Sequence, residues 1–196
     1  MEINRLESFS DGVLAVIITF MVLEFKVPTD ATLASLTKLT PLFLSYLLSY
    51  LTVAIMWVNH HHLLKAARRA DAKVMWANSN LLFWMSLFPF ATAYIAAHPG
   101  QPLPVAVYGA VATPMGFGFA ILRRAIACQY ESHEPDLAGI HSRVQWKNYF
   151  SALLYVFAVG LAFVNVYISY AIYVFVPLSF FLPERGLERF VESRGK

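Results

Sequence analysis

The 196-residue sequence has little charge: 14% of its residues are Asp, Glu, Lys or Arg, against about 25% in a typical soluble domain. This shortage excludes an ordinary soluble fold, and with it a soluble basic surface for nucleic acid. The single cysteine, Cys128, excludes an internal disulfide. The sequence also lacks a Gly-x-Ser-x-Gly, a His-Glu-x-x-His and a phosphate-binding glycine loop. We therefore expect no enzyme, no catalytic residues and no cofactor.

The sequence has long stretches without charge instead. A helix needs about 20 mostly apolar residues to cross a bilayer, so these stretches mark membrane spans. They cover residues 12–23, 39–64, 74–122 and 148–183; the first has only 12 residues and crosses the bilayer only if its helix also includes flanking charged residues such as Arg5, Glu7 and Asp11. A cluster rich in proline and glycine at 98–104 divides the third stretch, and the fourth is long enough for two crossings that turn near 165–169. We predict an all-α integral membrane protein with a single domain, residues 1–196, and six transmembrane helices at about 4–26, 40–64, 74–97, 104–128, 145–164 and 168–183.

The basic residues predict the orientation. With six spans, 13 of the 15 Lys and Arg residues fall on the side of the N-terminus, and only Lys26 and Lys38 fall on the other. Basic residues are enriched in cytoplasmic loops. The sequence thus predicts a multi-pass protein of the cell membrane with both termini in the cytoplasm.

Polar residues gather toward the cytoplasmic ends of the first three predicted helices, at Asp11, 59–62 and 78–80. Arg5 and Asp11 are six residues apart, about 120° around a helix, so they do not pair with each other. Each needs a partner on another helix, and the histidines and asparagines at matching depth are available. We expect a structural network that fixes the first helix in register. The alternative is that this network also couples to gating or proton sensing.

The run His60-His61-His62 does not predict a metal site, because successive side chains on a helix point about 100° apart and cannot converge on one ion.

One face of the first helix carries Gly12, Val16, Thr19, Phe20 and Leu23, spaced by three or four residues. Such a mostly apolar stripe suits packed core or lipid contact as well as a pore. Charges at both helix ends and Asp11 within the span favour an interior position. Apolar rings gate conduction by dewetting, and a hydroxyl such as that of Thr19 contacts ions. A six-helix monomer has no obvious room for a water path, which favours symmetric assembly around copies of this helix.

The motif Arg5-x-x-x-Phe9-Ser10-Asp11, followed by Ala15-Val16-Ile17-Ile18-Thr19, resembles the signature of the transmembrane protein 175 family of potassium channels, in its bacterial single-repeat branch. The likeness continues at 57–62, 80–83 and 87–93. It covers the first three predicted helices, whereas the last three agree only in length and hydropathy.

This resemblance implies a homotetramer of six-helix subunits whose first helices line a central pore, without a filter of backbone carbonyls. Val16 would form the hydrophobic constriction or gate, Thr19 would favour potassium, and Phe20 and Leu23 would form the next pore-facing layers. The family usually has isoleucine or leucine at the constriction and leucine in place of Phe20. The resemblance, together with the depth of the polar residues, implies a structural network whose candidate members are Arg5, Phe9, Ser10, Asp11, His60, His61, His62 and Asn80.

The sequence therefore predicts a potassium-permeable ion channel of weak to moderate selectivity. Its expected partners are potassium ions, the lipid bilayer and copies of itself, with no metal site. The main alternative is a proton-coupled secondary transporter that uses Asp11 and the cluster His60–His62. A scaffold or assembly protein without transport is a second alternative.

Overall fold

The computed structural model is an all-α chain in which residues 2–129 and 135–181 are described, those at 135–144 by their backbone alone. The described helices, in chain order, are α1 (Ile3–Leu23), α2 (Leu33–Thr37), α3 (Thr40–Lys65), α4 (Ala72–Met85), α5 (Phe88–Ala97), α6 (Pro102–Ala127), α7 (Pro135–Leu161) and α8 (Val166–Ser179).

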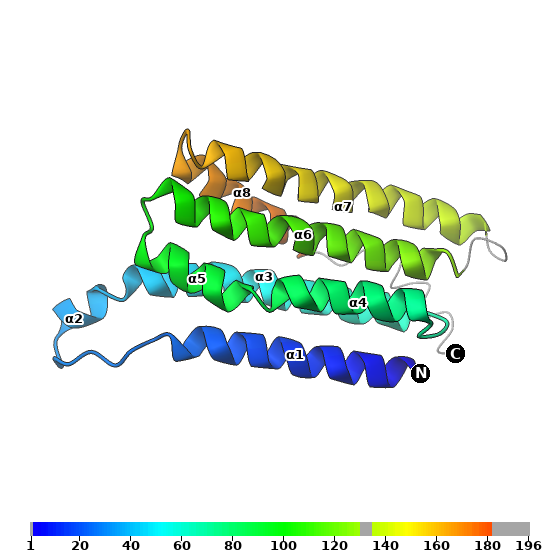
Figure 1. The fold of residues 1–196 in the computed structure, drawn as a ribbon, viewed down its shortest axis with the longest axis horizontal. Helices are drawn as coiled ribbons and strands as arrows, with labels where there is room; N and C mark the ends of the chain where they lie inside the picture. Colours follow the sequence, from blue (N-terminus) through cyan, green and yellow to red (C-terminus); the bar gives the residue numbers. More distant parts are fainter. Residues whose placement is uncertain (1, 130–134, 182–196) are drawn as a thin grey trace.

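The long helices run nearly parallel or antiparallel to one another and form an elongated bundle (Figure 1). α1 lies along one edge, where it packs on α3, α4 and α5, and α7 lies along the opposite edge. α6 packs on both α4 and α7, and α8 packs on α7, α3 and α6. The core therefore surrounds α6. In the most apolar 18 residues of α6, 61% of the residues are buried, whereas in the corresponding part of α1 only 28% are buried.

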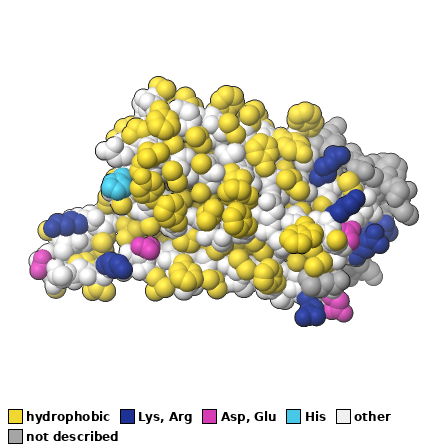
Figure 2. Space-filling model, in the orientation of Figure 1, with side chains coloured by type: hydrophobic (Ala, Val, Ile, Leu, Met, Phe, Trp, Pro, Cys, Tyr) yellow, Lys and Arg dark blue, Asp and Glu magenta, His cyan; other side chains and the backbone are white. Residues whose placement is uncertain are grey.

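Four described segments are long and apolar enough to cross a bilayer: α1, α3, the α4–α5 segment at Ala72–Ala97, and α6. α8 is apolar but shorter, with 14 residues. Hydrophobic side chains cover the middle of the face shown in Figure 2, whereas the Lys, Arg, Asp and Glu side chains gather at its two ends. An apolar belt between two charged ends is the surface of a multi-pass membrane protein.

One end of the bundle is much more basic than the other, and we call it the basic end. It contains the start of α1, the α3–α4 loop and the end of α6. Its described basic residues include Arg5, Lys65, Arg68, Arg69, Lys73 and Arg124.

The helix predicted at 74–97 is interrupted in the structure. α4 ends at Met85 and α5 begins at Phe88, with Ser86 and Leu87 as the caps between them. Pro89 causes this break, because it has no N–H to donate to the carbonyl of Met85 and its ring clashes with that carbonyl. The two short helices still continue in one direction and form one candidate span.

Several other helix boundaries differ from the prediction; α1, for example, ends at Leu23 instead of at about 26. α7 begins at Pro135, ten residues before the predicted start, and α8 covers Val166–Ser179 instead of 168–183, of which residues 182 and 183 lie outside the described part. Asn165 starts α8, since its side-chain oxygen accepts a hydrogen bond from the N–H of Tyr167 (2.9 Å). The short α2 was not predicted; Thr32 caps it by accepting from the N–H of Ser35 (3.3 Å).

Candidate functional site

One face of α1 packs against the rest of the bundle. Its buried residues recur every three or four positions, as the contact face of a helix requires. They are Leu6, Ser10, Leu14, Ile17 and Met21. The helices that α1 contacts are α3, α4 and α5.

The opposite face of α1 is exposed in the single chain, and it carries the stripe predicted to line a pore. Val16 is 52% exposed, Phe20 58% and Leu23 63%. Gly12 and Thr19 are exposed as well. At 100° per residue, the centre of the stripe lies about 140° around the helix from the centre of the buried face. The fold therefore leaves five aligned residues available to a second molecule, to lipid or to ions.

Thr19 is the hydroxyl residue of this stripe. Its Oγ1 donates a hydrogen bond to the carbonyl of Ala15 (2.9 Å). Since the hydroxyl hydrogen is used within the helix, the lone pairs of the oxygen remain as acceptors. An exposed oxygen of this kind interacts favourably with a cation.

A broad open groove of about 760 Å³ runs beside the stripe. Phe9, Val16 and Phe20 line one wall, and Pro89 and Phe90, at the α4–α5 break, line the other. The interruption of the third predicted helix thus shapes the surface next to the stripe.

A buried hydrogen-bonded chain fixes the packed face of α1 to its neighbours near the basic end. Ser10 on α1 donates to its own helix at the carbonyl of Leu6 (2.8 Å) and accepts from the Nδ2 of Asn78 on α4 (2.9 Å). The Oδ1 of Asn78 is 2.6 Å from the Nε2 of His60 on α3. Because this oxygen only accepts, the hydrogen bond assigns the proton to Nε2 of His60. Ser10, Asn78 and His60 are all at most 1% exposed, so the three side chains connect three helices away from water.

Two further contacts connect α1 with α3 beside this chain. The Nε1 of Trp57 donates to Asp11 (2.8 Å), and the Nδ1 of His61 is 2.5 Å from the carboxylate of Glu7. Residues 7 and 11 are one helical turn apart on α1, and residues 57 and 61 are one turn apart on α3. The two helices are antiparallel, so both contacts form in the same register and prevent α1 from turning about its axis.

The other residues predicted for the network lie outside these contacts. Arg5 and Phe9 are exposed, Phe9 by 58%. His62 is half-buried, with its ring centroid 5.8 Å from that of His61. Asn80 is exposed beside Gly118 of α6. The partner of Asp11 was expected among the histidines and asparagines of the neighbouring helices, whereas in the structure the indole of Trp57 donates to it.

The predicted network did not include Glu7 or Trp57, and from the cluster 78–80 it included Asn80 but not Asn78. Glu7 and Asp11 are four residues apart, and so are Trp57 and His61. This equal spacing was a usable signal that the two pairs contact each other across antiparallel helices. No sequence signal distinguishes the buried Asn78 from Asn80, because both are asparagines two positions apart and Asn80 is exposed.

Among the described residues, no group of three His, Cys, Asp or Glu side chains is placed to hold a metal ion. His60 faces Asn78, and His61 faces Glu7. The adjacent histidines therefore point to different partners.

Comparisons with known proteins place these features in context. A family model described as "Endosomal/lysosomal potassium channel TMEM175" matches residues 5–89, which include the stripe and the network. A potassium channel of Chryseobacterium sp. is 41% identical over 187 residues, 95% of this chain and 96% of the relative. A potassium channel of Chamaesiphon minutus is 33% identical over 184 residues, 86% and 88% of the two chains. A crystal structure of a lysosomal potassium-selective channel TMEM175 homolog from Chamaesiphon minutus matches with a TM-score of 0.78 at 30% identity, over 91% of this chain and 95% of that one.

Proposed function

The chain belongs to the TMEM175 family, and from this premise we propose that it is a potassium-permeable ion channel. In this proposal each subunit crosses the membrane six times, and four subunits assemble around the exposed stripe of α1.

The orientation of α1 is the observation that carries the proposal. Buried contacts hold Ser10 toward α4, while Asp11 and Glu7 bond to α3. This leaves Val16, Phe20 and Leu23 more than half exposed on the other side of the helix. A pore on the symmetry axis needs such a face, fixed in direction and free of contacts within its own subunit.

The proposed constriction is a ring of Val16 side chains, one from each subunit. Narrow apolar rings control conduction by excluding water when they are too tight. Phe20 and Leu23 form further apolar layers away from the basic end, and Thr19, between Val16 and Phe20, supplies an oxygen that favours cations. Since one hydroxyl per subunit replaces only part of the hydration shell of an ion, we expect weak to moderate selectivity for potassium and no filter of backbone carbonyls.

The proposed location is the cell membrane, with the basic end and both chain termini in the cytoplasm. The support is the distribution of charge, because described Lys and Arg residues concentrate at the basic end, whereas Lys26 and Lys38 lie toward the other.

Potassium efflux from liposomes tests the proposal. The purified protein is reconstituted into potassium-loaded liposomes, and efflux is followed with and without a protonophore, so that proton permeability is measured separately. We expect potassium efflux that does not saturate with concentration and exceeds sodium efflux. If the protein migrates as an intact oligomer and potassium efflux is no faster than from empty liposomes, the channel proposal is refuted. Saturable efflux that requires a proton gradient would instead identify the proton-coupled transporter that Asp11 and the histidines suggest as the alternative.

A further inference from the structure

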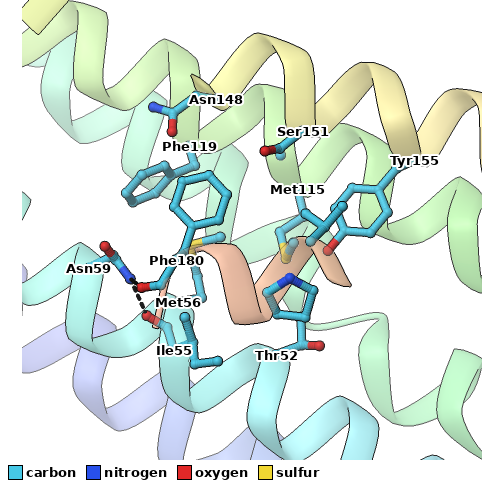
Figure 3. Close-up of a pocket in the computed structure, with 13 residues that line it drawn as sticks. Thr52, Ile55, Met56, Asn59, Met115, Phe119, Asn148, Ser151, Tyr155 and Phe180 are labelled. Atoms are coloured by element: carbon cyan, nitrogen blue, oxygen red, sulfur yellow. Dashed lines mark hydrogen bonds between the residues drawn. The ribbon is translucent and has the colours of Figure 1, made fainter. Parts of the chain in front are cut away.

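A small, partly open cavity lies away from the α1 stripe, between α3, α6, α7 and α8. It contains about 40 Å³ of space. Figure 3 shows Asn148 and Ser151 projecting from α7 over this space, with the rings of Phe119 and Tyr155 beside them. Most of the lining is apolar; its polar side chains are those of Thr52, Asn59, Asn148, Ser151 and Tyr155.

Asn148 is the unusual residue of this cavity. It is 2% exposed, and neither its Nδ2 nor its Oδ1 has a hydrogen-bond partner among the described residues. A buried amide strongly favours hydrogen bonding, and the large majority of buried side-chain polar atoms have a partner. The side chain lines the cavity, so a polar ligand within the cavity is the remaining source of partners.

Asn59 and Ser151 offer further polar atoms to the same ligand. The amide nitrogen of Asn59 donates to the carbonyls of Ile55 (2.8 Å) and Phe180 (3.1 Å), which leaves its Oδ1 to accept. Ser151 is 7% exposed and carries a hydroxyl that both donates and accepts. A ligand here meets donors and acceptors from both α3 and α7.

The volume identifies the ligand as water. One buried water molecule needs about 10–15 Å³ measured in this way, and a cavity that binds benzene has about 150 Å³. A space of about 40 Å³ therefore suits two or three water molecules and is too small for a ring. Lys147 lies next to Asn148, and its Nζ donates to the carbonyl of Ser179 (2.8 Å). The same amine lies 4.3 Å from the ring centroid of Phe180, which lines the cavity, so a charged group is close to this space.

We propose that the cavity between α3, α6, α7 and α8 is a hydration site, in which two or three water molecules bind the buried amide of Asn148 and connect α7 with α3. This site is separate from the α1 stripe and does not depend on ion conduction.

Radiolytic footprinting of the intact protein in liposomes tests the proposal. X-rays generate hydroxyl radicals from water in place, so a buried side chain is oxidised only where a bound water is its neighbour. Met115 lines the cavity and is 2% exposed, whereas Met85 is 1% exposed and does not line it. We expect Met115 to be oxidised several times faster than Met85. Equal rates at the two methionines would overturn the proposal.

A substitution identifies the residue that holds the water. Asn148→Leu removes both polar atoms at similar size, and we expect Met115 oxidation to fall to the level of Met85. Asn80→Leu is the control, because Asn80 is exposed on α4 and does not line the cavity; it should leave the Met115 rate unchanged. Unchanged oxidation of Met115 in Asn148→Leu would refute the role of Asn148. If Asn148→Leu does not fold, the comparison of Met115 with Met85 in the unmodified protein still decides whether the cavity holds water.

Discussion

At the scale of single residues, Asn78 is the centre of the contacts that orient α1. It donates to Ser10 on one side and accepts from His60 on the other. Without it, the Nε2–H of His60 remains buried without an acceptor, and such a group costs about 1–3 kcal/mol. The direction of the stripe thus depends on an amide on another helix.

Replacing Asn78 tests this role. We expect Asn78→Ala to lower the free energy of unfolding by about 1–3 kcal/mol in thermal or denaturant unfolding of the purified protein. Asn80→Ala is the matched control on the same helix; since Asn80 is exposed, its effect should stay within about 0.5 kcal/mol. Equal losses in the two variants would contradict the account.

Sequence reasoning identified the cluster 78–80 but not the member that matters. The depth of a residue in the membrane follows from its position along a helix, and that is visible in the sequence. The direction of a side chain toward a neighbouring helix depends on how α4 packs on α1 and α6. Only the packed structure distinguishes Asn78 from Asn80.

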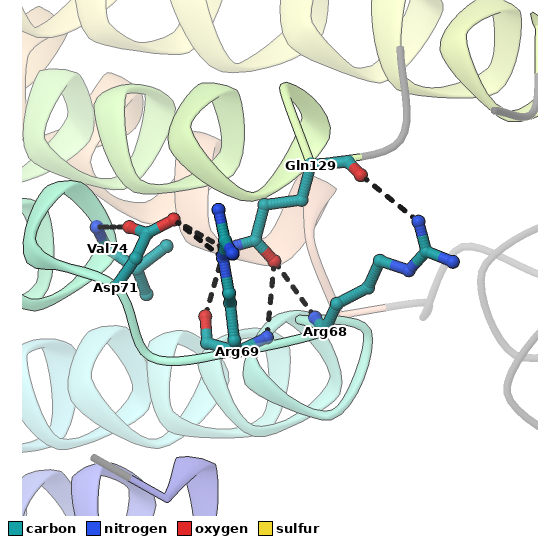
Figure 4. A network of polar contacts seen from close by, with 5 residues as sticks. All are labelled: Arg68, Arg69, Asp71, Val74 and Gln129. Atoms are coloured by element: carbon teal, nitrogen blue, oxygen red, sulfur yellow. Dashed lines mark hydrogen bonds and ion pairs between the residues drawn. The ribbon is translucent and has the colours of Figure 1, made fainter. Parts of the chain in front are cut away.

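At the scale of elements, Gln129 holds the α3–α4 loop to the end of α6 (Figure 4). Its Oε1 accepts from the N–H groups of Arg68 (2.9 Å) and Arg69 (3.4 Å), and its Nε2 donates to the carbonyl of Arg69 (2.9 Å) and to Asp71 (3.1 Å). Asp71 also caps α4 by accepting from the N–H of Val74 (3.0 Å). A glutamine just beyond α6 thereby fixes where α4 begins.

The hydrogen bond from the N–H of Val74 is the largest cause of the lowered pKa of Asp71, and the hydrogen bond from Gln129 and the charge of Arg69 act in the same direction. A carboxylate with a lowered pKa stabilises the fold fully above its unfolded pKa, near about 4, and less as the pH falls through the folded value. We expect Asp71→Ala to cost about 1 kcal/mol at pH 7. The loss should shrink below about pH 4.

Thermal unfolding of the unmodified protein and of Asp71→Ala in detergent, at pH values from 7 to 3, measures how the loss of stability changes with pH. Asp30→Ala, at an exposed position in the loop before α2, serves as the control and should have little effect at any pH. A loss at Asp71→Ala that is the same at both pH values would exclude the charged cap.

α6 packs closely on α7 and α8 at Gly109. A Cβ at this position would lie 2.9 Å from Cγ2 of Val159 and would collide with the hydroxyl of Tyr173. That hydroxyl donates to the carbonyl of Val105 (2.8 Å), so it does not move away without losing the bond.

We expect Gly109→Ala to destabilise the protein by about 1–3 kcal/mol through this overlap. Gly160→Ala on α7 is the control, because a Cβ there meets nothing within 4 Å. Removing a glycine from a helix should then stabilise by about 0.5–1 kcal/mol. Unfolding measurements that give both variants the same sign would contradict the packing at Gly109.

Most elements were predictable because their signals are local. Long apolar stretches identified the segments of α1, α3 and α6, and the cluster at 98–104 separated α5 from α6. The prediction placed one helix at 74–97, although Pro89 carried the signal for a break. The start of α7 at Pro135 was not predictable from the length of the charge-free stretch, because the first residues of this helix include Asp136 and Arg143.

At the scale of the whole molecule, the fold leaves the apolar stripe of α1 exposed, on the side of the helix opposite its packed face. The chain is similar to a solved potassium-selective channel over 91% of its length. Its membrane character was predictable from composition. Assembly was not predictable from spacing alone, because the number of copies depends on surfaces that no single chain defines.

The central claim is that the stripe of α1 lines the ion path, and block by Cd²⁺ at position 16 tests it most directly. Cys128 is exposed, so the measurement starts from Cys128→Ser with Val16→Cys added. Thiolates from several subunits around one axis bind a soft cation tightly. Val22→Cys is the matched control: Val22 is 45% exposed and Val16 52%, but the two lie about 120° apart around the helix.

The account predicts that Cd²⁺ abolishes potassium current through Val16→Cys and leaves the current through Val22→Cys and the Cys128→Ser background unchanged. Current through Val16→Cys that persists in Cd²⁺, with block at Val22→Cys instead, would contradict it.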